Sequence, residues 1–274
     1  MKKKNYQISF LGTGCVGTAF AYHLQKQGYQ IIGGFDINKH KLRRFYQLLK
    51  IKYQIPTLPE LIRTSNLVFI TTPDAEIKKT YQKIFPYLNR QTIVIHCSGA
   101  LDTKIFYSAK EKKLIPIGIH PIQTFTTISQ SIKSITNIYF GIEANSKAKA
   151  IANEIVLALK GKSIFIKSQD KPLYHTMCVF VSNYLVVLIS IVSNIARELK
   201  IKPKNELRVL WPLINQTLTN ISKFDPKKAL TGPIVRGDLI TIKSHLKVLK
   251  KRFPELISLY KLMAKQAHLL LTRK

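Results

Sequence analysis

Apolar and polar residues follow two patterns along this chain, and the change lies near residue 167. Before it, short apolar runs are separated by stretches of helical period, which predicts strands alternating with helices. After it, the apolar residues keep a helical period and no strand pattern returns. The pattern predicts a doubly wound, mostly parallel α/β sheet over residues 1–167 and an all-helical domain over 168–274.

The individual elements can be read from the same pattern. The predicted strands are residues 6–11, 29–35, 66–70, 91–95, 114–119, 137–142 and 163–166. Helices are predicted from about residue 18, over 38–50 with Leu42, Phe45, Leu48 and Leu49 inward, over 74–87, from 103, and over 146–159, 170–200, 204–221, 238–250 and 254–271, with a short helix-like connection over 56–63.

The stretch from Met177 to Ile195 is apolar for about the length of a membrane span. Serines and asparagines interrupt it, and a helix that is apolar on all sides also suits a core or a dimer interface. We therefore expect a homodimer through this long helix and no membrane partner.

A glycine-rich turn follows the first predicted strand. The sequence Gly12-Thr13-Gly14-Cys15-Val16-Gly17 has the spacing G-x-G-x-x-G and opens the first helical segment. In a dinucleotide site the first glycine makes the tight turn, the second lets the backbone approach the pyrophosphate, and the third lets the helix pack on the sheet. Since the helix N-terminus also favours phosphate, we expect this turn to bind a dinucleotide, although similar turns close ordinary strand–helix units.

Asp36 ends the second predicted strand, about 20 residues after the turn, where a carboxylate accepts hydrogen bonds from ribose hydroxyls. The helix that follows begins with the cations Lys39, His40, Lys41, Arg43 and Arg44. A 2′-phosphate requires such cations, whereas Asp36 repels it. The cofactor is therefore predicted to be NAD or NADP, with Asp36 favouring NAD.

Polar clusters follow three later strands, at the carboxyl ends where doubly wound sheets bind ligands. After residues 66–70 come Thr71, Thr72 and Pro73, expected to contact the cofactor, and Asp74, which is suited to capping the next helix. The candidate substrate-binding residues after the next two strands are His96, Ser98, Gly99, His120 and Gln123. The alternative for each histidine is a structural side chain with its hydrogen bonds satisfied.

A polar stripe marks the start of the long helix. Lys171, His175 and Asn183 are spaced by four and eight residues, which predicts that they share one helix face. Lys171 is the candidate proton donor, with His175 as an alternative acid or positioning donor and Asn183 as a substrate ligand. Arg236 lies in the loop from Ala229 to Asp238, where it either binds a substrate carboxylate or belongs to a simple helix connection.

Composition adds little to this picture. The formal charge of +30 is spread along the chain rather than gathered with aromatic residues, so we expect no specific nucleic-acid partner, although a positive field attracts small anionic substrates. Cys15, Cys97 and Cys178 are far apart and lack metal spacing, so we expect no metal and a reduced cytoplasmic location. Met1 to Lys4 lead into a strand pattern, and no secretory signal is expected.

Taken together, the motifs resemble those of bacterial Rossmann-type proteins with a C-terminal helical domain catalogued as of unknown function, relatives of ketopantoate, pyrroline-5-carboxylate and β-hydroxyacid dehydrogenase-type reductases. The motifs are Gly12-x-Gly14-x-x-Gly17, Thr72-Pro73-Asp74-x-x-Ile77, His96-x-Ser98-Gly99-Ala100, His120-Pro121-x-Gln123-Thr124-Phe125, Lys171-x-x-Tyr174-His175, Ser182-Asn183-Tyr184 and Leu230-Thr231-Gly232-Pro233-x-x-Arg236-Gly237-Asp238. The resemblance implies a catalytic lysine at Lys171, with His175 where the family has an asparagine, and a substrate-binding turn at Ser98 and Gly99.

We therefore expect an NAD(P)-dependent oxidoreductase that reduces a small 2-oxo acid, with the family resemblance pointing to 2-dehydropantoate (ketopantoate) in pantothenate synthesis. The substrate carbonyl would be bound by Ser98, His120 and Asn183, while Lys171 supplies the proton. The alternatives are a cyclic-imine reductase and a non-catalytic protein that senses the cofactor or binds polyanions.

Overall fold

A computed structural model describes residues 6–52, 57–202 and 206–272 of the chain. It divides into two compact units, Met1–Val187 and Leu188–Lys274. This division falls inside a helix, after the predicted boundary at 167. Pro56 and Lys204, with which two predicted helical segments begin, and Met1 to Lys4 lie outside the described residues.

The first unit is built on one seven-stranded sheet with the order β2-β1-β3-β4-β5-β6-β7. The strands are β1 (Gln7–Leu11), β2 (Gln30–Phe35), β3 (Leu67–Ile70), β4 (Ile93–His96), β5 (Ile115–Pro121), β6 (Tyr139–Ala144) and β7 (Lys162–Phe165). All neighbours pair parallel except β5 and β6, which are antiparallel. The predicted mostly parallel Rossmann-type sheet is confirmed.

Helices connect these strands. They are α1 (Cys15–Lys26), α2 (Lys39–Leu49), α3 (Leu58–Thr64), α4 (Asp74–Ile84), α5 (Ile128–Ser134), α6 (Ser146–Ala158) and α7 (Lys171–Val179). Two sequence expectations need correction: the helix expected from residue 103 is only the 3-10 turn Thr103–Ile105, and α5 was not predicted. On α2 the inward residue next to Phe45 is Tyr46 rather than Leu48, because its hydroxyl donates to the Gly34 carbonyl of β2.

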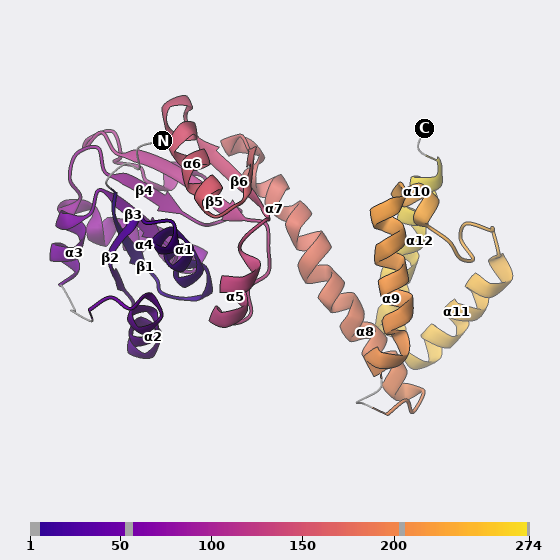
Figure 1. The fold of residues 1–274 in the computed structure, drawn as a ribbon. Helices are drawn as coiled ribbons and strands as arrows, with labels where there is room; N and C mark the ends of the chain where they lie inside the picture. Colours follow the sequence, from indigo (N-terminus) through magenta and orange to yellow (C-terminus); the bar gives the residue numbers. More distant parts are fainter. Residues whose placement is uncertain (1–5, 53–56, 203–205, 273–274) are drawn as a thin grey trace. The chain divides into compact units, whose positions relative to one another are not determined.

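Successive side chains of a buried strand point to opposite faces of the sheet, and helices cover both faces (Figure 1). In β3, Leu67 and Phe69 pack in the core with α1, α2 and α6, whereas Val68 and Ile70 pack on the other face with α3 and α4. Because both faces are covered, all four β3 residues are buried, as expected for a parallel strand.

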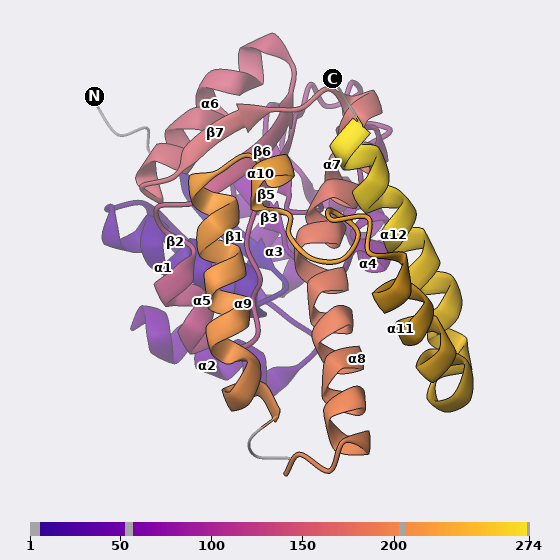
Figure 2. The ribbon, with the colours of Figure 1, turned by 90° about the vertical axis from the view of Figure 1, so that its right-hand side faces the viewer.

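After β7 the described chain is helical. A π-helical turn, Phe180–Tyr184, interrupts the long helix between α7 and α8 (Leu185–Glu198). The second unit contains α9 (Glu206–Lys223), α10 (Pro226–Ala229), α11 (Leu239–Arg252) and α12 (Ile257–Thr272). Within it, α11 and α12 are joined through the short turn Pro254–Leu256 (Figure 2).

One helical stretch among the described residues, Ser168–Glu198, is long and apolar enough to cross a membrane by length and composition alone, with a mean hydropathy of 2.0 over an 18-residue window. In the part of it that belongs to the first unit, Leu173 and Val181 are 73% and 69% exposed. The absence of a membrane partner stays a prediction.

Candidate functional site

A cavity of about 810 Å³ lies over the carboxyl ends of β1 and β3. The chain leaves β1 for β2 on one side and returns to β3 on the other, and such a change of direction opens the crevice in which doubly wound sheets bind ligands. The predicted cofactor residues that line the cavity are Gly12, Gly14, Cys15, Val16, Asp36, Thr71, Thr72 and Pro73. Thr13 is buried behind it, and Gly17 packs beneath the turn.

The glycines of the turn differ in what surrounds them. Gly12 has φ +95°, and a Cβ there would lie 2.7 Å from the carbonyl carbon of Thr71. A Cβ on Gly17 would overlap the Gly12 carbonyl oxygen and the Thr71 hydroxyl. Gly14 is the opposite case, because no described heavy atom lies within 4 Å of its Cβ position. Gly12 and Gly17 are therefore required by the protein itself, whereas the space over Gly14 is open.

The N-terminus of α1 begins at this open space. Its first turn carries no acidic residue, and Gly14 occupies the N-cap position. The first N–H groups of a helix lack intrahelical partners and carry partial positive charge. This arrangement fits the pyrophosphate of a dinucleotide.

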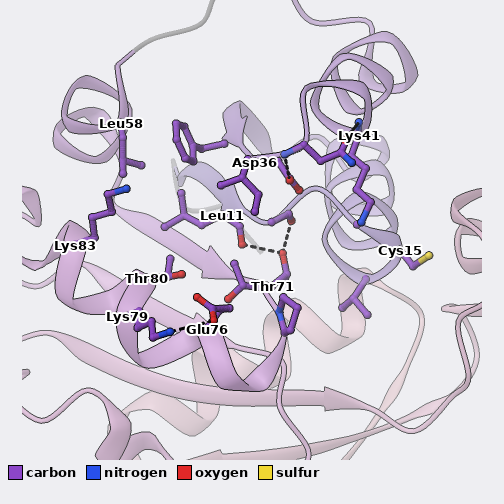
Figure 3. A pocket seen from close by; sticks show the side chains of 18 of the residues that line it. Leu11, Cys15, Asp36, Lys41, Leu58, Thr71, Glu76, Lys79, Thr80 and Lys83 are labelled. Atoms are coloured by element: carbon purple, nitrogen blue, oxygen red, sulfur yellow. Dashed lines mark hydrogen bonds and ion pairs between the residues drawn. The ribbon is translucent and has the colours of Figure 1, made fainter.

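Asp36 is held firmly in the cavity wall. Its Oδ2 accepts hydrogen bonds from the Thr13 N–H at 2.7 Å and the Thr13 hydroxyl at 3.1 Å, and its Oδ1 accepts from the Asn38 N–H at 2.8 Å. A carboxylate offers about four acceptor positions, so roughly one remains for a ligand. Figure 3 shows Lys41 on one side of the cavity and Lys79 and Lys83 on the other.

A second cluster lies at the ends of β4 and β5, and the Ser98 turn is at its centre. The Ser98 hydroxyl donates to Asp74 Oδ2 at 2.6 Å and accepts from the N–H groups of Ala100 and Leu101. A hydroxyl has one donor and two acceptor positions, so its capacity is filled within the protein. In this geometry Ser98 shapes the turn, and its predicted contact with substrate stays a prediction.

Lys171 reaches this turn from the start of α7. Its side chain is only 1% exposed, and Nζ donates to the Ser98 carbonyl oxygen at 2.7 Å. Burial lowers the pKa of Lys171, while the carboxylate of Glu143 opposes the shift. The proton is therefore released more easily than from an exposed lysine, and the ammonium group uses one of its three N–H donors on the Ser98 carbonyl.

Two imidazoles meet beside Gly99. The rings of His120 and His175 have centroids 6.0 Å apart, and a Cβ on Gly99 would lie 2.9 Å from His120 Nε2 and would contact His175 Cδ2. Burial, together with the charges of Lys171 and His175, lowers the pKa of His120 to about 4, so it is neutral at pH 7. Both rings are partly exposed. His120 has Nε2 at the glycine of the turn, whereas His175 has the ring carbon Cδ2 there.

His96 occupies a different place from the other two histidines. It is fully buried, its Nδ1 accepts from the Ser98 N–H at 3.2 Å, and burial lowers its pKa to about 3. Its other ring nitrogen, Nε2, is buried without a hydrogen-bond partner among the described residues. His96 thus supports the turn through Nδ1 alone, and its role in substrate binding stays a prediction.

Among the described residues, three of the predicted ones make no hydrogen bond or ring contact with this cluster. The exposed amide of Gln123 folds back on its own loop, where Oε1 accepts from the Thr124 N–H. Asn183 is exposed in the π-helical turn. The expected common face with Lys171 assumed a regular α-helix, and the wider turn breaks that register. Arg236 lies in the second unit.

Three further residues of the site were missed as functional candidates. Asp74 was expected to cap α4, but Pro73 holds the cap position and the Asp74 carboxylate binds Ser98 instead. Tyr174 binds His120, and the buried Glu143 accepts from Thr103 and Ser168. Tyr174 stands in a motif of the resemblance, and an acid inside the apolar strand β6 was the signal for Glu143. Among the described residues no group of three His, Cys, Asp or Glu could hold a metal ion.

Comparison with known proteins agrees with this architecture. Residues 7–99 match a family model described as NADP oxidoreductase, coenzyme F420-dependent, and residues 138–267 match one described as a domain of unknown function (DUF2520). No curated protein matches the chain.

Several solved structures share the fold over nearly the whole chain. A Bacteroides fragilis protein named as a candidate NADP oxidoreductase is 22% identical, with a TM-score of 0.77 over 96% of this chain and 98% of that one. Protein TM1727 from Thermotoga maritima is 25% identical, with a TM-score of 0.72 over 96% and 98%. Pyrroline carboxylate reductase from Plasmodium falciparum, solved with NADP bound, is 14% identical, with a TM-score of 0.59 over 98% and 99%.

These matches support the coarser part of the sequence prediction, an NAD(P)-dependent oxidoreductase with a Rossmann-type domain. They do not bear on ketopantoate, on a preference for NAD or on a homodimer, which stay predictions.

Proposed function

We propose that this protein is an NAD(P)H-dependent reductase of a small 2-oxo acid. The observation that carries the proposal is the cavity over Gly14, which Thr72 and Pro73 help to line, together with the hydrogen bond from Ser98 to the neighbouring Asp74. Pro73 lines the cavity, and the next residue, Asp74, holds Ser98. The residues suited to a dinucleotide and those suited to a small polar substrate are thus adjacent.

A reduced nicotinamide supplies a hydride when it is bound. The chain's own residues then have to hold the substrate oxygen and provide a proton. His120 offers Nε2 beside Gly99, the ring of His175 lies at the same glycine, and Lys171 is the proposed proton donor because burial lowers its pKa. Asn183, Gln123 and Arg236 remain proposed substrate ligands.

For the cofactor we propose a preference for NADH. The three hydrogen bonds to Asp36 fix its negative charge in the cavity wall, so the carboxylate cannot turn away from a 2′-phosphate. The remaining acceptor position suits a ribose hydroxyl. Lys41 in the same wall is the cation that would work against this preference.

Ketopantoate is the substrate to test first, on the family resemblance. A second candidate is the reduction of a cyclic imine, supported by the fold shared with pyrroline carboxylate reductase. The third is a protein that binds the cofactor without turnover. NADH or NADPH is mixed with the purified protein and either ketopantoate or pyrroline-5-carboxylate, and cofactor absorbance is followed.

Oxidation that requires ketopantoate supports the first proposal, and oxidation that requires the imine supports the second. Cofactor binding without oxidation in the presence of any oxo acid or imine would overturn both.

We also propose a homodimer through the long apolar helix, as a soluble cytoplasmic protein without a specific nucleic-acid partner. The support is the exposed apolar surface of its first part, which includes Leu173, Phe180 and Val181. Light scattering at micromolar concentration without detergent should give twice the mass of 31.3 kDa. A stable monomer would contradict the dimer, and protein recovered only in detergent would favour the membrane.

A further inference from the structure

The antiparallel pair β5–β6 brings a tyrosine onto His120. His120 faces Gly141 across the two strands. A Cβ on Gly141 would overlap the hydroxyl of Tyr174, so the tyrosine ring occupies the space that the glycine leaves. The Tyr174 hydroxyl lies 2.7 Å from His120 Nδ1, and the two rings meet edge to face.

The direction of this hydrogen bond determines where the His120 proton lies. Burial raises the pKa of Tyr174, so the residue is a neutral phenol with one proton to donate. Its two acceptors are His120 Nδ1 and the Cys178 sulfur. A thiol sulfur is a weak acceptor, whereas an imidazole nitrogen is a strong one. Donation from Tyr174 to Nδ1, the stronger acceptor, puts the proton of the neutral His120 ring on Nε2, whereas donation to Cys178 would let the Tyr174 oxygen accept from Nδ1–H.

His120 Nε2 is the atom that faces the substrate side of the turn. It lies beside Gly99, and the described residues offer it no hydrogen-bond partner within the protein. The Ser98 hydroxyl, by contrast, is fully used. Among the described residues, the titratable groups that interact with His120 are Lys171, His175, His96 and Tyr174, and none of these is a carboxylate that would favour an imidazolium.

We propose that Tyr174 is a positioning residue that holds His120 as the Nε2–H tautomer, so that the site selects a carbonyl oxygen over a protonated imine nitrogen. A carbonyl oxygen accepts a hydrogen bond from Nε2–H, and a neutral imidazole is an established way to polarise a carbonyl. The N–H of a protonated imine needs an acceptor and instead meets a donor. This inference rests on the proposed reductase function and gives its site a substrate class.

The tautomer can be measured without catalysis. In protein labelled with ¹⁵N-histidine, long-range ¹H–¹⁵N spectra at pH 7 distinguish a protonated ring nitrogen from an unprotonated one, and His120→Gln identifies the signals. We expect an unprotonated Nδ1 and a protonated Nε2 in the wild type, and mixed tautomers in Tyr174→Phe. Tyr81→Phe is the matched control, because the Tyr81 hydroxyl is buried without a partner among the described residues.

An Nδ1–H tautomer or an imidazolium in the wild type would overturn the proposal, as would an unchanged tautomer in Tyr174→Phe. In enzyme that turns over, Tyr174→Phe should lower kcat/KM for ketopantoate about tenfold relative to the imine, while Tyr81→Phe leaves this ratio unchanged. An unchanged ratio in Tyr174→Phe would refute the selectivity.

If neither substrate is reduced, the proposed reductase function is wrong. The inferred selectivity for a carbonyl oxygen is then tested by the binding of the two compounds. Ketopantoate added with NAD⁺ should shift the His120 Nε2–H signal in the wild type, and pyrroline-5-carboxylate with its imine protonated should not. The same shift with both compounds, or with neither, would overturn it.

Discussion

Replacing Gly14 by alanine should weaken cofactor binding with little change in the stability of the folded protein. The residue has φ −73° and ψ −159°, which alanine adopts freely, and no described atom lies within 4 Å of the new methyl group. Alanine restricts the unfolded chain but is a slightly poorer N-cap than glycine, and the two effects oppose each other. The free energy of unfolding should therefore change by less than about 1 kcal/mol.

The same methyl group enters the space that a pyrophosphate would occupy at the start of α1. Moving the phosphates outward weakens one or two hydrogen bonds from the helix N–H groups, each worth about 1.5–3 kcal/mol when charge-assisted. A factor of ten in Kd corresponds to about 1.4 kcal/mol, so NADH should bind roughly 10- to 100-fold more weakly.

The assay is calorimetric titration with NADH, combined with thermal unfolding in the absence of ligand. Gly12→Ala is the matched control, because its Cβ would lie 2.7 Å from the Thr71 carbonyl carbon and its φ is +95°. That variant should lose stability by about 1–3 kcal/mol before any ligand is added. If Gly14→Ala were as stable as the wild type and bound NADH equally well, the cavity over Gly14 would not be the pyrophosphate site.

The remaining predictions concern charge. Lys171→Met should lower turnover on the order of a hundredfold. The variant loses one charged hydrogen bond to Ser98, so the free energy of unfolding, measured in urea, should fall by no more than about 3 kcal/mol. Turnover at the wild-type rate would remove Lys171 from the mechanism. Asp36→Asn should improve NADPH affinity relative to NADH about tenfold, since a charge beside the phosphate is removed, and a shift toward NADH would reverse the cofactor preference. The pKa values of His96 and His120 are about 3 and about 4, whereas an ordinary histidine has 6.5. Between pH 6.5 and 4 these two histidines therefore bind protons in the unfolded chain but not in the folded chain. The free energy of unfolding should fall across that window by on the order of 3 kcal/mol per histidine, and a urea midpoint that stays constant from pH 7 to 5 would contradict this burial.

The sequence pattern predicts the fold well because both sheet faces are covered. Buried strands such as β3 read as short apolar runs, and each of the seven strands lies within two residues of its predicted range. The pattern fails where local geometry is decided by one contact. Residues 103–105 make only a 3-10 turn, and the Thr103 N–H and hydroxyl bind the Glu143 side chain, a partner 40 residues away that no local period reveals.

Some residues of the candidate site could likewise be predicted from the sequence, and others could not. The glycine turn and Asp36 could be located because their spacing is local and their chemistry is stereotyped. Which polar side chains remain free to meet a ligand could not be predicted, because it depends on partners from other strands. In the sequence the Ser98 hydroxyl is expected to bind substrate, but in the structure all its hydrogen-bonding positions are used within the protein. Tyr174 reads in the sequence as a packing residue, but its hydroxyl is hydrogen-bonded to His120, a candidate substrate ligand.

The hydrogen bond between Asp74 and Ser98 links the two proposed ligand sites. Pro73 borders the cavity proposed for the cofactor, and the adjacent Asp74 binds the turn that carries Gly99. A dinucleotide that orders residues 72–74 would thereby order the turn proposed for the substrate. Linkage then requires reciprocity: whatever factor the cofactor adds to substrate affinity, the substrate adds to cofactor affinity. Ser98→Ala would uncouple the two ligands while leaving each with a place to bind.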